Sequence, residues 1–365
     1  MASEAVFLPA FGNRPSHLVG RDEIVDGFVR GLRSPVGNPE RATLLIGRRG
    51  MGKTALLLAF AESAESQGFL VARVTAGDEM LADIVGTIQR KGTPYIKKNP
   101  QVKGVSAGAL GFAFGLTFSD EVERSFSFLN KMALLCDALE KHDKGIVLLV
   151  DEIQAHTPSL RILTTTYQHL VGEGKNVVIA MAGLPHAISS LLNDEVLTFL
   201  NRARKNRLGP LSLSAVSLYY SSVFDGLGKS ISPENLARAV EATRGYPYLL
   251  QLIGYYLLEY SGNSKGITGD QTEQALASAK HDLTENIYAP VLKPLSARDR
   301  QFLQAMSKTK GPVRVTDIEK RMRTTRGNVQ AYRRRLMDAG VIASEQRGEL
   351  ELVIPYLGEY LRREF

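Results

Sequence analysis

Residues 47–54 read Gly-Arg-Arg-Gly-Met-Gly-Lys-Thr and follow the largely apolar run of residues 42–46, Ala-Thr-Leu-Leu-Ile. The eight residues match the pattern G-x-x-x-x-G-K-S/T without a mismatch. In this pattern a glycine-rich turn directs backbone N–H groups at phosphate oxygens as the chain passes from a strand into a helix. Residues 55–61 are rich in helix formers. The sequence therefore predicts a strand, a phosphate loop (residues 47–54) and a helix whose positive end faces a nucleotide.

The phosphate loop also assigns roles to individual side chains. Lys53 is expected to reach the β- and γ-phosphates, and the Thr54 hydroxyl is expected to ligate Mg²⁺. ATP or GTP with Mg²⁺ is thus the expected ligand, against the alternative of a glycine-rich turn that binds nothing. The predicted nucleotide contacts from this stretch are Gly47, Arg48, Arg49, Gly50, Met51, Gly52, Lys53, Thr54 and Ala55.

A second apolar run, residues 145–150, ends in Asp151 and Glu152. In a parallel sheet the carboxyl ends of the strands share one edge, where nucleotides bind. Asp151 is therefore expected to hold Mg²⁺, directly or through water. Glu152 is expected to orient and polarise the attacking water, so it joins Lys53 as a predicted catalytic residue. The alternative is an exposed acidic turn at the end of a strand.

The 365 residues suit two or three domains. Buried strands are expected at 42–46, 68–74, 145–150 and 176–183, alternating with helices that include 79–90 and 121–142, which indicates an α/β fold with a parallel sheet. Helical periodicity throughout 214–280 predicts an all-helical lid. The expected domains are 1–212, the nucleotide-binding domain; 213–290, the lid; and 291–365, here called the terminal module.

The terminal module carries 16 Lys and Arg against 9 Asp and Glu, a net charge of +7 that equals the formal net charge of the whole chain. Helices opening at Ser296, Thr316 and Thr325, followed by a hairpin over 341–354, predict a winged helix. Its third helix would contact double-stranded DNA, although winged helices also dock proteins. The candidate DNA contacts are Arg326, Asn328, Gln330, Arg333, Arg334 and, at the wing tip, Arg347.

Other features narrow the class of protein. A single cysteine, Cys136, excludes an intrachain disulfide, and no Cys/His cluster has the spacing of a zinc site. No signal peptide or membrane-spanning stretch is evident, so a cytoplasmic protein without membrane attachment is expected. Residues 92–120 include the basic positions Lys97, Lys98 and Lys103, and then alternate apolar with small residues over 104–118, which suits a hairpin. This hairpin would be either a partner contact or a flap covering its own domain.

Taken together, these motifs resemble AAA+ P-loop ATPases of the branch that includes the origin-recognition initiators and the related STAND and transposition-helper ATPases. The resemblance spans about 18–354. It is carried by residues 18–23 (Leu-Val-Gly-Arg-Asp-Glu), the Walker A stretch 47–54, the Walker B stretch 148–154, residues 202–211, residues 243–248 (Thr-Arg-Gly-Tyr-Pro-Tyr) and the terminal winged helix.

The resemblance implies further roles. Gly20 and Arg21 would lie near the adenine, and the turn ending in Pro247 would contact nucleotide from the lid. Arg202 or Arg204 would be an arginine finger offered to a neighbouring subunit, which implies a homo-oligomer or a partner protein. Arg244 would be a second sensor of the nucleotide. Family members usually have a polar sensor at the end of the fourth strand, where residues 182–183 here are Ala-Gly. Either hydrolysis is therefore expected to be slow, or sensing would fall to another residue.

The expected function is that of a DNA-binding ATPase, with ATP and Mg²⁺ as cofactors and ADP and phosphate as products. Its nucleotide state would control the position of the lid and winged helix, or oligomerisation. One alternative is a nucleotide-gated regulatory or signalling switch with little turnover, whose winged helix binds protein or an operator. Another is a helper ATPase that recruits a nuclease or transposase, because the sequence carries no such catalytic motif of its own.

Overall fold

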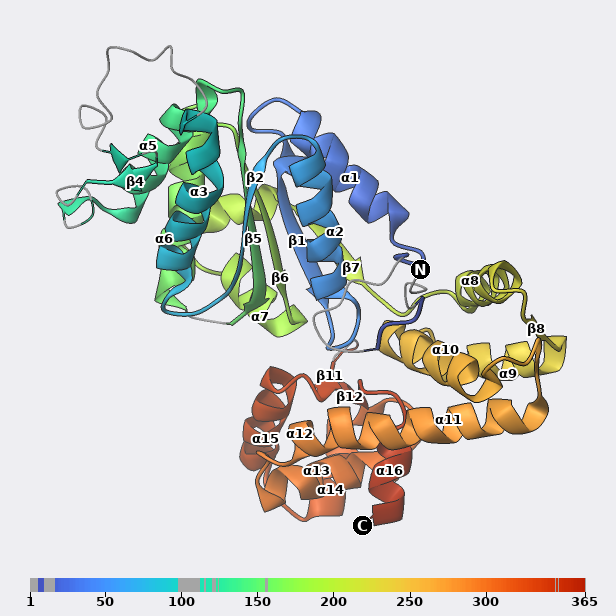
Figure 1. Cartoon of the computed structure of the whole chain (residues 1–365). Helices are drawn as coiled ribbons and strands as arrows, with labels where there is room; N and C mark the ends of the chain where they lie inside the picture. The colour runs from blue at the N-terminus through green and yellow to red at the C-terminus, as the bar shows by residue number, and fades with distance from the viewer. Residues whose placement is uncertain are drawn as a thin grey trace. The chain divides into compact units, whose positions relative to one another are not determined.

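The computed structural model describes residues 6–9, 17–97, 112–114, 116–119, 123, 125–154, 157–344, 346 and 348–364. The chain divides into two compact units. The sheet unit comprises residues 21–47 and 53–208, and the helical unit comprises residues 1–20, 48–52 and 209–365. Figure 1 labels the elements of both units along the chain.

The sheet unit contains a five-stranded sheet in the order β2-β5-β6-β1-β7, and all neighbouring strands run parallel. This confirms the predicted α/β class. The strands are β1 (Ala42–Gly47), β2 (Leu70–Thr75), β5 (Ile146–Ile153), β6 (Val177–Gly183) and β7 (Arg204–Leu208). Every residue of β6 is buried, and so are the first five of β5. Such continuous burial is typical of parallel strands covered on both faces.

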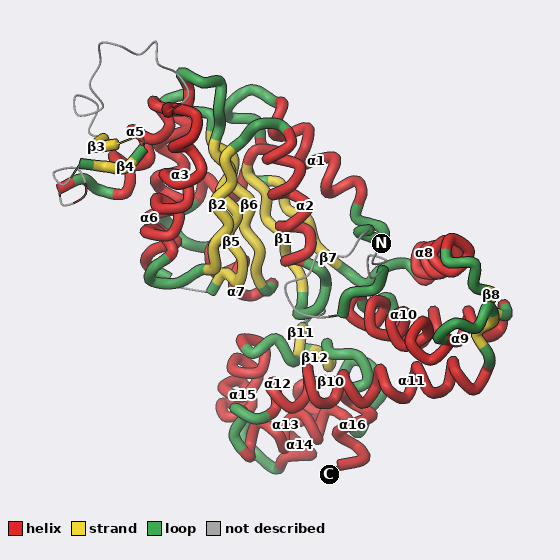
Figure 2. Tube along the Cα trace, viewed as in Figure 1, coloured by secondary structure: helices red, strands yellow, loops and turns green. Residues whose placement is uncertain are grey.

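Helices flank this sheet in Figure 2. They are α1 (Asp22–Arg33), α2 (Lys53–Ser66), α3 (Met80–Lys97), α5 (Phe128–Glu140), α6 (Pro158–Gly172) and α7 (Pro185–Leu192), with 3₁₀-helices η1 (Pro39–Arg41) and η3 (Thr198–Arg202). The Phe28 and Phe60 rings stack 4.0 Å apart and join α1 to α2. The single cysteine, Cys136 on α5, is buried in this core, and burial raises the pKa of its thiol to about 12.

Two helices of the sheet unit differ from their predicted lengths. The helix predicted over 121–142 is represented by α5, which begins only at Phe128 because the Ser127 side chain accepts a hydrogen bond from the Asn130 N–H and caps it. In contrast, α3 continues past its predicted end to Lys97. Within that extension Gly92 leaves room for Leu116, since a Cβ at Gly92 would lie 2.2 Å from a Leu116 methyl carbon.

Leu116 belongs to the hairpin expected in the 92–120 segment, formed by β3 (Phe112–Phe114) and β4 (Thr117–Phe118). Leu116 and Phe118 are buried in the core of the sheet unit. For its described residues, the hairpin is therefore a flap that covers its own domain. Residues 98–111, which include the predicted basic positions Lys98 and Lys103, lie outside the described residues.

The helical unit begins with the four helices expected of a lid: α8 (Leu213–Gly226), α9 (Pro233–Thr243), α10 (Pro247–Ser261) and α11 (Gly269–Leu283). Strands β8 (Ser230–Ile231) and β9 (Gly266–Ile267) form a short parallel pair between them. A π-helical turn (Thr284–Tyr288) and α12 (Ala289–Leu292) extend α11 toward the terminal module. Residues 6–9 join this unit: Phe7 is buried against Gly254, and the Leu8 N–H donates to the Gln251 side chain at 2.9 Å.

The terminal module has the three predicted helices and the predicted hairpin. They are α13 (Ala297–Ser307), α14 (Val315–Met322), α15 (Arg326–Asp338), β11 (Ile342–Ala343) and β12 (Glu349–Leu352), with β10 (Val313–Arg314) completing an antiparallel sheet of order β10-β12-β11. The predicted cap at Thr316 is wrong, because the N-cap of α14 is Arg314, two residues earlier, and the helix starts at Val315. A last helix, α16 (Leu357–Glu364), packs on α13 and was not predicted. The winged-helix assignment and the division at residue 291 stay predictions.

Candidate nucleotide site

The phosphate loop links β1 to α2, as predicted. Gly50 and Gly52 adopt φ values of 73° and 83°, in the left-handed region that favours glycine. Helix α2 begins at Lys53, whose Nζ donates to the Gly47 carbonyl at 2.8 Å. The strand, the turn and the helix thus have the arrangement in which backbone N–H groups at a helix start can receive an anion.

The two predicted magnesium ligands meet in the sheet unit. The Thr54 hydroxyl donates to Asp151 Oδ2 at 2.6 Å, although the two residues lie 97 positions apart in sequence. Hydroxyl and carboxylate oxygens suit Mg²⁺, which uses few protein ligands and completes its shell with water and phosphate. No group of three or more His, Cys, Asp or Glu side chains that could hold a metal occurs among the described residues. The pair fits the small set of protein ligands that a nucleotide-bound Mg²⁺ needs.

Glu152 occupies an unusual backbone conformation beside this pair. Its φ of 53° lies in the left-handed region, and the pairing of β5 with β6 shifts register between Val150 and Ile153. Asp151 Oδ1 accepts a hydrogen bond from the Glu152 N–H at 2.8 Å, which helps to hold the conformation. A non-glycine residue there costs on the order of 1–3 kcal/mol, and bulges of this kind redirect side chains. The backbone conformation of the exposed Glu152 therefore coincides with a local irregularity of the sheet. The sequence pattern did not indicate this irregularity.

The end of β6 has no polar side chain, as the sequence indicated. Gly183 pairs with Ile46 on one side and Ile153 on the other. A Cβ at Gly183 would lie 3.2 Å from carbon atoms of both Ile153 and Ile188. The strand end is thus close-packed and apolar, so a larger side chain would have to displace these neighbours.

In the helical unit, the turn between α9 and α10 contacts the tip of the phosphate loop. Gly245, with φ of 67°, lies so close to the Leu211 carbonyl that a Cβ would be 2.3 Å from it. Tyr246 is 2 % exposed, and burial raises the pKa of its phenol. Its hydroxyl donates to the Arg49 carbonyl, and its ring end lies against Gly50. The turn that ends in the predicted contact Pro247 is therefore joined to the loop through its neighbour Tyr246.

The candidate finger arginines lie away from the phosphate loop of their own chain. Arg202 is exposed at the end of η3, and Arg204 pairs with Thr43, four residues before Gly47. At about 3.3 Å per residue, Arg204 is roughly 13 Å along the sheet from the start of the loop. Arg207, which pairs with Ile46, is exposed and nearer the loop.

Most of the predicted DNA-contacting side chains are exposed on α15. Arg333 is the half-buried exception, and it donates to Gln330 at 3.4 Å. The neighbouring Arg335 instead pairs with the buried Asp299 at 2.7 Å and so supports the fold. Exposure is shared by Arg326, Asn328, Gln330 and Arg334, whereas Arg347 lies outside the described residues.

Comparisons with known proteins agree with this fold. A family model described as a domain of unknown function (DUF8462) matches residues 285–361. None of the curated proteins matches the sequence. In the part of the chain that the structure describes, no helix is long and apolar enough to cross a membrane.

Three solved structures are similar over nearly the whole chain. The Walker-type ATPase PABY2304 of Pyrococcus abyssi is 17 % identical, with a TM-score of 0.67 over 96 % of this chain and 97 % of that one. The Aeropyrum pernix ORC2 protein, solved as ADPNP and ADP complexes, is 15 % identical, with a TM-score of 0.63 over 97 % and 95 %. Cdc6p of Pyrobaculum aerophilum is 16 % identical, with a TM-score of 0.51 over 98 % and 97 %. The chain thus has the α/β P-loop ATPase fold.

Proposed function

We propose that this protein binds ATP with Mg²⁺ at the phosphate loop and hydrolyses it to ADP and phosphate. The observation that carries the proposal is the hydrogen bond between the Thr54 hydroxyl and the Asp151 carboxylate beside the start of α2. It brings together two oxygen ligands from separate motifs at the helix end that favours an anion. The similar ORC2 protein was solved with ADPNP and ADP, which supports this choice of ligand.

Phosphate binding, Mg²⁺ binding and activation of water are assigned to different groups of the site. The backbone N–H groups of residues 50–55 and the Lys53 ammonium would hold the phosphates. Thr54 and Asp151 would hold Mg²⁺, which when bound neutralises charge on the β- and γ-phosphate oxygens. Glu152 would orient a water molecule for attack on the γ-phosphorus and accept its proton as the bond to the leaving ADP breaks.

Slow turnover by an isolated chain is part of this proposal. Gly183 offers no polar group at the end of β6, Arg204 lies at the start of β7, away from the loop, and Arg202 precedes it at the end of η3. An arginine finger from this stretch would therefore act on the nucleotide of a second subunit. A homo-oligomer or a partner ATPase would raise the rate, because an added cation at the γ-phosphate stabilises the transition state.

We further propose that the terminal module binds double-stranded DNA. Its net charge of +7 and the exposed polar face of α15 support this, since Lys and Arg contacts with phosphates supply most of non-specific DNA affinity. The nucleotide state would control the position of the lid and the module, or oligomerisation. A nucleotide-held switch with little turnover is the second candidate, and the apolar end of β6 at Gly183 favours it.

The deciding experiment measures ATP hydrolysis with and without duplex DNA for the wild type, Lys53→Ala and Glu152→Gln. DNA-stimulated turnover that both variants lose would support an ATPase that works on DNA. ATP binding with negligible turnover on any DNA would reject that function in favour of the nucleotide-held switch. If the wild type binds no nucleotide, both candidates fail.

DNA binding by α15 is tested separately. The double variant Arg326→Ala/Arg334→Ala should weaken duplex binding and flatten its dependence on salt. Arg298→Ala is the matched control, because Arg298 is an exposed arginine on α13 that donates to Gln301. Equal loss in the control would show that general basicity, and not the face of α15, is responsible.

A further inference from the structure

An arginine of the phosphate loop is paired with an acid of the terminal module. Arg48, the second residue of the loop, forms an ion pair with Glu351 on β12. The side chains are 23 % and 26 % exposed, so the pair is partly shielded from water. Arg48 and Glu351 belong to the same compact unit, although 303 positions separate them.

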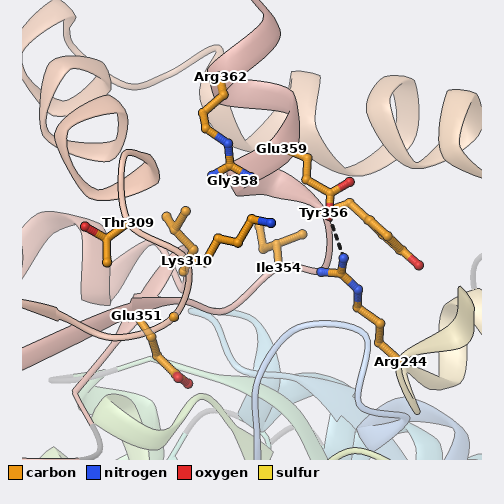
Figure 3. Close-up of a pocket in the computed structure, with 11 residues that line it drawn as sticks. Arg244, Thr309, Lys310, Glu351, Ile354, Tyr356, Gly358, Glu359 and Arg362 are labelled. Atoms are coloured by element: carbon orange, nitrogen blue, oxygen red, sulfur yellow. Dashed lines mark hydrogen bonds and ion pairs between the residues drawn. The ribbon is translucent and has the colours of Figure 1, made fainter. Parts of the chain in front are cut away.

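A second ion pair joins the module to the turn that covers the loop. Arg244, two residues before Tyr246, pairs with Glu359 at 2.6 Å, and its guanidinium lies 3.7 Å above the Tyr356 ring. The Tyr356 hydroxyl in turn donates to the Ala242 carbonyl at 2.8 Å. Figure 3 shows Arg244 and Glu359 pointing toward each other, at a cavity of about 350 Å³ that Glu351 also lines. Two module acids therefore engage two arginines at or next to the phosphate loop.

The position of Glu351 conflicts electrostatically with a bound nucleotide. A loop that takes a polyphosphate favours nearby cations and disfavours nearby anions. Glu351 holds its carboxylate against the guanidinium of Arg48, where shielding from water strengthens both attraction and repulsion. A nucleotide phosphate and Glu351 would therefore compete for Arg48.

We propose that Glu351 is a latch that ties the terminal module to the phosphate loop and that nucleotide binding opens it. This rests on the nucleotide site proposed above. While the Arg48–Glu351 pair is closed, it lowers nucleotide affinity; once phosphate engages Arg48, β12 is released. By linkage, any partner that draws β12 away from the loop must raise nucleotide affinity by the same factor.

The module provides a close control for Glu351. Glu349 lies two residues earlier on β12, so its side chain leaves the same face of the strand. It pairs with Arg314 at 3.8 Å, and its side chain is 31 % exposed, close to the value for Glu351. The two glutamates therefore match in strand, face and exposure. They differ in their partners, because Glu351 pairs with the phosphate loop and Glu349 pairs within the module.

The test is calorimetric titration of the full chain with ADP and with a non-hydrolysable ATP analogue, each with Mg²⁺. Glu351→Gln should bind both about fivefold more tightly than the wild type, the scale of one ion-pair coupling. Glu349→Gln should stay within about twofold, since its partner belongs to the module. In an Arg48→Ala background the effect of Glu351→Gln should disappear, because the contested cation is gone.

Hydrogen exchange of residues 349–352 gives a second readout. Nucleotide should speed exchange there in the wild type, and Glu351→Gln should exchange fast without nucleotide. The latch is overturned if Glu351→Gln binds nucleotide no better than Glu349→Gln while the wild type binds and Lys53→Ala does not. If the wild type and Lys53→Ala both fail to bind, the proposed nucleotide site itself is wrong. Thermal melting of each variant confirms that the glutamine substitutions fold.

Discussion

The sheet of the sheet unit is stabilised in a different way from the terminal module. In the sheet, β5 has eight residues, and its first five are buried without a charged side chain among them. In the module, β11 has two residues and β12 has four, and both glutamates of β12 form ion pairs. The sheet is thus specified by continuous apolar burial, whereas the module adds polar pairs to an apolar core that includes Phe302, Ile318 and Val329. Disruptions of the two regions should differ in size and in their dependence on pH and salt.

The largest expected effect is on chemistry at the edge of the sheet. Glu152→Gln should reduce ATP hydrolysis by about 100- to 1,000-fold, because the amide cannot accept a proton from the attacking water. Nucleotide affinity should change by less than about threefold, since binding is assigned to other groups. Phosphate-release kinetics measure the rate of hydrolysis, and titration measures the nucleotide affinity. The control is Glu173→Gln, because Glu173 is an exposed acid after α6. If this variant loses as much ATP hydrolysis, Glu152 has no specific role in the reaction.

The next effect tests the apolar core of the sheet. Leu148→Ala in β5, where Leu148 is 1 % exposed, should lower the free energy of unfolding by about 2–5 kcal/mol through lost burial and a cavity. Ile162→Ala on α6, where the side chain is 47 % exposed, should change it by no more than about 0.5 kcal/mol. Urea unfolding gives both values. If Leu148→Ala lowers the free energy of unfolding only slightly, the stability of the sheet does not depend on its continuous apolar strands.

In the module, Asp299 tests the importance of a single polar group. It is 3 % exposed. Burial acts to raise its pKa, but hydrogen bonds from Arg335 and Ser296 prevail and hold the pKa below its ordinary value. A lowered folded-state pKa contributes stability at pH above the unfolded value of about 3.9, and this is lost as pH falls through the folded value. Asp299→Asn should cost about 1–3 kcal/mol at neutral pH.

The pH dependence supplies the control for this variant. Asp299→Asn should remove part of the wild-type loss of stability below pH of about 4, because the amide does not titrate. Unfolding measured from neutral pH to about pH 3 checks the sign. If the variant and the wild type lose stability in parallel on acidification, the pairing of Asp299 with Arg335 does not stabilise the module.

The smallest effect is expected at an exposed ion pair of the lid. Arg238 on α9 pairs with Glu273 on α11, and their side chains are 36 % and 64 % exposed. Glu273→Gln should cost less than about 1 kcal/mol, because water and salt screen such pairs. Thermal unfolding at low and high salt measures it. If Glu273→Gln costs as much stability as Asp299→Asn, the exposure of a polar pair does not predict its contribution to stability.

Much of the sheet unit could be predicted because its signals are local. The phosphate loop is a contiguous motif, and β1, β5 and β6 are apolar runs that mark strands buried on both faces. Strand β7 was not predicted. Its sequence, Arg-Lys-Asn-Arg-Leu, is polar because it lies at the edge of the sheet, where most of its side chains remain accessible.

Features of the candidate site that depend on three-dimensional detail had no sequence signal. The left-handed conformation of Glu152 falls where the pairing of β5 with β6 shifts register. The contact of Tyr246 with the loop joins residues 197 positions apart. Neither motif nor periodicity reports such pairs, because both describe neighbours along the chain. The Thr54–Asp151 pair was foreseen because each residue belongs to a motif of its own.

The burial of Cys136 makes the protein convenient to label. It is the only cysteine in the sequence, and its raised pKa of about 12 leaves almost no thiolate at neutral pH. A cysteine introduced at an exposed position would therefore react selectively with a maleimide dye. One at Glu173 in the sheet unit and one at Lys265 in the helical unit would form a donor–acceptor pair. The wild-type background would need no cysteine removed before single-molecule recordings with and without nucleotide.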